Sequence, residues 1–273
     1  MNPRLRRVAA AAALSALAAL LGACASTPSS SPPAPPRAPE PLPPIEAPEV
    51  SPKDRAALHA DLAAGYYERG RMDIAIEELA EAATLDPANP RIYNYFGLVY
   101  AMLGENAKAE QNFQRALALA PEDSDLRHNW GWYLCSNERP RESIPEFELA
   151  LRNPFYKTPE VALTNAGRCS AAFGDLAGAE AYYRRALARS PTNAPAMYGL
   201  ALLAFKGGHL DEARGYTKRL AQLAAPVPEA LYLGMCVERK AGDRAAEALY
   251  VAQLRNRYPD SAEAKAVSTG LCE

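Results

Sequence analysis

A spacing of 34 residues recurs along most of this 273-residue chain and limits its possible folds more than any other feature. Glycines fall in step with this spacing, apart from one interval that is two residues longer than two units: Gly70, Gly104, Gly174, Gly208 and Gly242. Alanines follow at fixed distances, and prolines close the units at Pro87, Pro121, Pro191 and Pro259. A period of this length is typical of stacked helical hairpins, because each unit must bury its apolar face against the next.

The repeated pattern resembles the tetratricopeptide repeat, whose unit is a helix, a tight turn and an antiparallel helix. Small residues in mid-helix allow close approach of two helix axes, and bulky residues such as Leu79, Phe113 and Phe147 fill the space beside them. Glycine after a first helix accepts a left-handed cap, and proline stops or starts the following helix. The sequence therefore predicts an all-α superhelix whose first helices line a concave groove. Its six helix-turn-helix units span 56–89, 90–123, 124–159, 160–193, 194–227 and 228–261, and a short capping helix follows within 261–269.

The beginning of the chain has the pattern of an export signal. Three arginines, Arg4, Arg6 and Arg7, precede an apolar run over 8–22, which is too short to cross a bilayer but fits a secretory signal. The string Leu21-Gly22-Ala23-Cys24 resembles the lipobox of bacterial lipoproteins, in which the cysteine is acylated and becomes the first mature residue. We therefore expect a signal peptide at 1–23 and lipidation at Cys24, with palmitate among the acyl chains.

A proline-rich segment separates the lipobox from the repeats. Ten prolines occur within 25–50, so this stretch cannot form helices or sheet ladders and is expected to be a semi-extended spacer. Alanine follows Cys24 where retention in the inner membrane would favour aspartate, which points to the periplasmic face of the outer membrane. The predicted organisation is a signal at 1–23, an acylated tether at 24–51 and a repeat domain at 52–273.

Composition and motifs argue against several classes of function. The formal net charge is −2 and no basic run occurs, so nucleic acid is not an expected partner. The three histidines, His59, His128 and His209, lie in three different units, and no phosphate-binding loop or nucleophile motif is present. We expect no enzymatic activity, no cofactor, no metal and no small-molecule substrate.

Four cysteines remain after Cys24, and an exported chain meets an oxidising compartment. Cys135 and Cys169 fall in adjacent first helices, which pack side by side, so we predict a disulfide between them. Cys236 and Cys272 could pair by docking the tail onto the sixth unit, and their pairing stays open.

Aromatic and amide side chains gather in the first three units. Tyr66, Phe96, Tyr100 and Trp130 stand at the inter-helix phase of the repeat, which predicts core packing. A second set falls on the groove face and is the candidate protein-binding set: Tyr67, Asn94, Leu98, His128, Asn129, Trp132 and Asn165. Asn129 and Asn165 recur at matching places, and such amides can hold a peptide backbone. The alternative is that these are ordinary packing or surface residues.

The lipobox, the six repeats and the strings "NWGWYLC" and "NPFYKTPEVALTNAGRC" together resemble the type IV pilus biogenesis and stability lipoproteins, the PilF/PilW pilotin family. The resemblance covers about 52–262, and the long proline-rich tether departs from it. It implies a non-enzymatic adaptor that binds subunits of the pilus secretin and promotes their localisation and multimerisation in the outer membrane. The alternative is a scaffold for another envelope machine, for β-barrel assembly or peptidoglycan synthesis, since repeat arrays of this kind have many partners.

Overall fold

The computed structural model describes residues 50–268 and residue 272, and within them every regular element is an α-helix. The predicted signal peptide, the predicted lipidation of Cys24 and nearly all of the predicted tether lie outside the described residues, so they stay predictions. None of the described helices combines the length and the apolar character that crossing a membrane would require.

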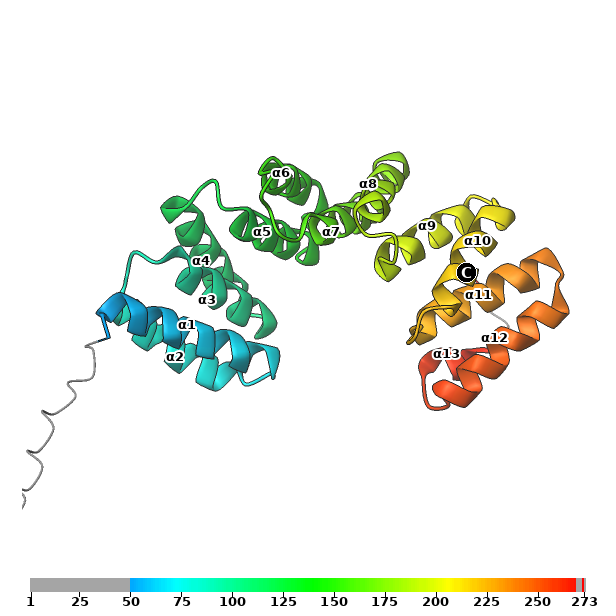
Figure 1. Cartoon of the computed structure of the whole chain (residues 1–273), viewed down its shortest axis with the longest axis horizontal. Helices are drawn as coiled ribbons and strands as arrows, with labels where there is room; N and C mark the ends of the chain where they lie inside the picture. Colours follow the sequence, from blue (N-terminus) through cyan, green and yellow to red (C-terminus); the bar gives the residue numbers. More distant parts are fainter. Residues whose placement is uncertain (1–49, 269–271, 273) are drawn as a thin grey trace, which may run out of the picture. The chain divides into compact units, whose positions relative to one another are not determined.

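Six antiparallel helix pairs follow one another along the chain (Figure 1), as the repeat predicts. The pairs are α1 (Pro52–Glu68) with α2 (Met72–Leu85), α3 (Pro90–Met102) with α4 (Asn106–Leu119), α5 (Ser124–Ser136) with α6 (Pro140–Leu151), α7 (Pro159–Ala172) with α8 (Leu176–Arg189), α9 (Ala194–Lys206) with α10 (Leu210–Ala221), and α11 (Pro228–Ala241) with α12 (Arg244–Arg257). A short helix, α13 (Ala262–Ala266), contacts α11 and α12 and provides the predicted capping helix.

The turns inside the pairs explain the glycine spacing. All five repeat glycines have positive φ angles between 73° and 89°, a backbone region that glycine enters without steric cost. The third pair has no glycine at this point, and Glu138 takes the left-handed conformation instead, with φ of 62°. Its position, 34 residues after Gly104, shows that the turn geometry continues where the sequence signal stops.

The two extra residues of the third unit lie in the connection from α6 to α7, within 152–158. This connection anchors itself through Tyr156, which is buried against Phe147 and Cys169. Its neighbour Phe155 is 87% exposed. The insertion therefore places one aromatic side chain in the core and one on the surface.

Close packing inside each pair depends on a small residue facing a large one. A Cβ on Gly97 would lie 2.8 Å from the ring of Phe113, and one on Gly131 would lie 3.0 Å from the ring of Phe147. Both rings are essentially inaccessible to solvent. The first helix thus lacks a side chain where the aromatic ring of the second helix lies, as the sequence predicts.

Contacts between pairs define the two faces of the stack. Each first helix contacts the next first helix along the series, whereas no second helix contacts another second helix among the described residues. The first helices are therefore closer together than the second helices, and they form the inner face of the repeat unit stack. This inner face is where a tetratricopeptide array offers surface to a protein ligand.

Candidate functional site

The predicted groove residues lie on four consecutive first helices, α1, α3, α5 and α7, but they are not equally accessible. Asn94 and Leu98 are buried, with 6% and 9% of their surface exposed. Tyr67 and Trp132 are half-buried and pack at the edge of a core cluster that contains Phe113. Packing thus accounts for much of the surface of these four side chains, and their role in binding stays a prediction.

The polar members of the set bind one another. Asn129 Nδ2 on α5 donates to Asn94 Oδ1 on α3 at 3.2 Å. His128 Nδ1 on α5 lies 2.5 Å from the hydroxyl of Tyr156, and its Nε2 lies 3.0 Å from Asn165 Nδ2 on α7. These hydrogen bonds connect three adjacent first helices, so the amides stabilise the structure even in the absence of a bound partner.

His128 is held in its neutral form by this environment. Burial lowers its pKa to about 4, because a charged imidazolium loses hydration inside the stack. Burial likewise raises the pKa of Tyr156 to about 12. A neutral imidazole has one donor and one acceptor nitrogen, which matches one bond to Tyr156 and one to Asn165.

The four aromatics predicted to be in the core divide into one buried residue and three half-buried ones. Trp130 is buried and stacks on Tyr133, with ring centroids 5.4 Å apart. Phe96 and Tyr100 are half-buried and stack on each other at 5.9 Å, and Tyr66 packs at the edge of the first core cluster. The interpretation of these residues as packing residues therefore agrees with the structure.

Both cysteine pairs are joined in the structure. Cys135 on α5 is bonded to Cys169 on α7, with Cα atoms 5.8 Å apart. Cys236 on α11 is bonded to Cys272 of the tail, with Cα atoms 5.4 Å apart. The first disulfide crosslinks two neighbouring first helices, and the second fastens the tail to the last unit.

A cavity of about 760 Å³ opens on the inner face between α7 and α9. Its walls include the apolar side chains of Val161, Tyr198 and Leu202, and Arg168 contributes a charged group. Of the predicted groove residues only Asn165 lines it. This cavity was not predicted from the sequence, and it lies one unit further toward the carboxyl end than most of the predicted set.

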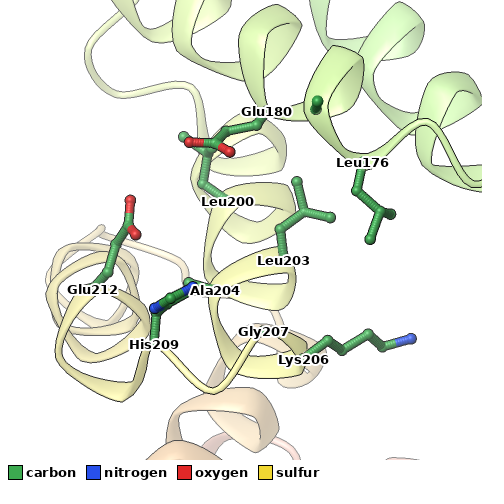
Figure 2. A pocket seen from close by; sticks show the side chains of 10 residues that line it. Leu176, Glu180, Leu200, Leu203, Ala204, Lys206, Gly207, His209 and Glu212 are labelled. Carbon is green, nitrogen blue, oxygen red and sulfur yellow. The ribbon is translucent and has the colours of Figure 1, made fainter.

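A second hollow, of about 450 Å³, lies between the start of α8 and the helices α9 and α10 (Figure 2). Figure 2 shows Leu203 facing Leu176, while the carboxylates of Glu180 and Glu212 lie at one end. Both carboxylates bind the guanidinium of Arg184, at 2.7 and 3.3 Å. Because both of its carboxylates already bind an arginine, this hollow is the weaker candidate for a binding site.

The described residues contain no cluster of histidine, cysteine, aspartate and glutamate side chains that could hold a metal ion. The features that the inner face does offer are hydrogen-bonding amides, aromatic surface and one apolar cavity with a cation. These features fit recognition of a polypeptide better than a covalent reaction.

Comparison with known proteins shows that the chain is similar to tetratricopeptide-repeat proteins, two of which are described as type IV pilus proteins. Four family models described as tetratricopeptide repeats match residues 65–104, 90–123, 128–194 and 170–233. The type IV pilus assembly protein PilF of Pseudomonas aeruginosa is 25% identical over 205 residues, which cover 75% of this chain and 81% of PilF.

Two solved structures extend this comparison. The crystal structure of PilW, a widely conserved type IV pilus biogenesis factor, is 32% identical, with a TM-score of 0.72 over 78% of this chain and 98% of PilW. The structure of Pseudomonas aeruginosa PilF has the same TM-score at 23% identity, over 81% of this chain and 99% of that one, and supports the fold.

Proposed function

The chain belongs to the family of tetratricopeptide-repeat proteins that contains PilW and PilF, and from this we propose that it is a protein-binding adaptor of type IV pilus assembly. The observation that carries the proposal is the match to PilW, because it extends over 98% of that protein at 32% identity. Arrays of this kind bind peptides or helices in the groove lined by their first helices. The adaptor acts by binding and placing a partner, without a covalent step.

The partner in this proposal is the pilus secretin, and the place of action is the periplasmic face of the outer membrane. The lipobox at 21–24 and the proline-rich stretch that follows support it, because an acylated cysteine on a long spacer would hold the repeats near a membrane. The adaptor binds secretin subunits along its inner face and promotes their insertion and multimerisation.

Deletion of the gene tests this function in the source bacterium. We expect loss of secretin multimers from outer-membrane fractions and loss of twitching motility, with both restored by the wild-type gene. Cys24→Ala removes the site of acylation, so the variant should be soluble and should fail to restore multimers in the outer membrane. Normal multimers in the deletion strain would refute the proposal.

Photocrosslinking identifies the partner directly. A photoreactive amino acid at Trp132 stands on the inner face, and the same amino acid at Leu249 of α12, a position that is 66% exposed, is the matched control. We expect a secretin adduct from position 132 and none from position 249. An adduct with a β-barrel assembly factor or a peptidoglycan synthase from position 132 would replace the secretin as the partner.

A further inference from the structure

The cavity between α7 and α9 exists because glycine stands where other units carry a larger side chain. At the equivalent point of successive first helices the sequence has Tyr95, Asn129, Asn165, Gly199 and Leu233, with the two-residue insertion falling between the second and third. Gly199 and Asn165 both line the cavity. The fifth unit therefore lacks a side chain on the inner face at the point where its neighbours have one.

A tyrosine from behind the inner face fills the back of this gap. The ring of Tyr183, on α8, lies so close that a Cβ on Gly167 would be 2.7 Å from its Cε1 and one on Gly199 would be 2.3 Å from its Cζ. The ring therefore lies between two consecutive first helices, and only glycine fits at both positions. Tyr183 is 6% exposed and lines the cavity.

The hydroxyl of Tyr183 and the guanidinium of Arg168 line this cavity, and neither has a hydrogen-bond partner within the described part of the chain, nor do the side chains of Glu160 and Ser190 on the same walls. Arg168 is exposed, and the Tyr183 hydroxyl is not fully enclosed. Burial raises the pKa of Tyr183, so its hydroxyl is a neutral donor at physiological pH. Both groups line the same cavity, and Arg168 directly follows Gly167, against which the Tyr183 ring packs, so the two donors lie on neighbouring parts of one wall. A phenol and a guanidinium together are complementary to a carboxylate.

Part of the remaining wall is apolar, and the hollow continues along the array. Val161, Tyr198 and Leu202 provide a surface for one large apolar side chain. A smaller hollow of about 160 Å³ shares Tyr198 and Leu202 and extends to α11. A chain can therefore pass through the cavity without ending there. Glu160 also lines the cavity, which disfavours a run of acidic residues.

We propose that this cavity binds an internal segment of a protein partner in which a large apolar residue stands next to one aspartate or glutamate. The apolar side chain packs against Val161, Tyr198 and Leu202, and the carboxylate accepts hydrogen bonds from Arg168 and from the Tyr183 hydroxyl. This inference rests on the proposed function, because it names the chemistry of the segment that the adaptor binds.

Selection from a peptide library tests the inference. Random twelve-residue segments are displayed inside a loop of a carrier protein, so that no free carboxyl terminus is offered, and are selected on the full-length protein. We expect enrichment of segments with Leu, Ile, Phe or Met beside Asp or Glu. An enriched segment, synthesised with both ends blocked, is then titrated calorimetrically in its acidic form and with the acid changed to its amide.

Variants of the protein test whether Arg168 and Tyr183 cause the preference for an acidic residue in the peptide. Arg168→Ala and Tyr183→Phe should each weaken binding of the acidic peptide, the former by at least about tenfold, since a hydrogen bond to a charged group is being lost. The amide peptide should bind wild type and Arg168→Ala alike. Arg255→Ala, on the exposed face of α12, is the control and should bind as wild type. Thermal unfolding confirms that the variants fold, which is expected because Arg168 is exposed and Tyr183→Phe keeps the ring.

Absence of the apolar and acidic pair among the selected segments would overturn the inference, as would equal affinity of Arg168→Ala and Arg255→Ala for the acidic peptide. The crosslink from position 132 distinguishes this failure from failure of the proposed function. Secretin adducts without the peptide preference would refute only the proposed ligand of the cavity and would leave the proposed function standing. The peptide preference without secretin adducts would refute the secretin as the partner and leave the chemistry of the cavity standing.

Discussion

The half-buried imidazole of His128 makes stability fall as the pH decreases, and the size of the effect follows from its environment. The folded chain holds this pKa at about 4, whereas an unfolded chain has the ordinary value near 6.5. Between these values the unfolded state binds the proton and the folded state does not, so acidification favours unfolding. From pH 7.5 to pH 5.0 the loss is about 2 kcal/mol, which corresponds to a decrease in melting temperature of about 4–8 °C for a domain of this size.

The assay is guanidinium unfolding of the full-length protein at several pH values between 7.5 and 5.0, for wild type and for His128→Gln. All other residues are common to both proteins, so the difference between the two pH profiles isolates His128. Both tryptophans of the chain, Trp130 and Trp132, lie on the same helix α5, so their fluorescence follows unfolding around the imidazole. If the two profiles are parallel, His128 is not protected from protonation and the reasoning fails.

Three further tests by substitution address the packing of the stack. Cys135→Ala combined with Cys169→Ala opens a loop that the disulfide closes over a sequence separation of 34. The free energy of unfolding, measured by chemical denaturation, should fall by about 2–4 kcal/mol. An unchanged denaturation midpoint would refute the stabilising role of the disulfide. Gly167→Ala places a methyl group against an aromatic ring and should destabilise the fold by about 1–3 kcal/mol. Gly215→Ala, with open space around it, should stabilise the fold by up to about 1 kcal/mol. The melting temperature should therefore fall for the first variant and rise for the second, and shifts in the same direction would contradict the packing argument. Glu238→Ala removes the buried carboxylate that binds the guanidinium of Arg214 on α10 at 2.7 Å and leaves it only the exposed Asp211 at 3.8 Å. The change should cost about 1–3 kcal/mol in thermal unfolding, and no loss would contradict the ion pair.

The helix pairs and their turns could be predicted because their signals are local and repeated. Glycine at a left-handed turn is favoured by the backbone itself, so Gly70 and Gly104 mark turns regardless of what surrounds them. Glu138 shows the limit of this signal. Its positive φ is imposed by the helices on either side, and no property of glutamate indicates it.

The contents of the candidate site were harder to predict, because they depend on distances between helices. The sequence placed Asn129 and Asn165 on the inner face, but their bonds to Asn94 and His128 require the spacing of adjacent first helices to be known. The cavity did have a signal in the sequence, which was the glycine at position 199 in a series of larger residues. Its significance becomes clear only when the ring behind it is located.

The two halves of the inner face should therefore contribute differently to binding of the proposed partner. A partner that approaches α3 and α5 meets amides that already bind each other, and any bond it forms there must replace one that is lost, so the net gain in free energy is small. A partner that enters the cavity meets the Tyr183 hydroxyl and the Arg168 guanidinium without internal partners, so a bond formed there replaces bonds to water and breaks none within the chain. Affinity should consequently concentrate at α7 and α9, while the surface of α3 and α5 contributes shape and exclusion of water. Substitution at Asn129 should then change unfolding far more than peptide affinity, and substitution at Arg168 should do the reverse.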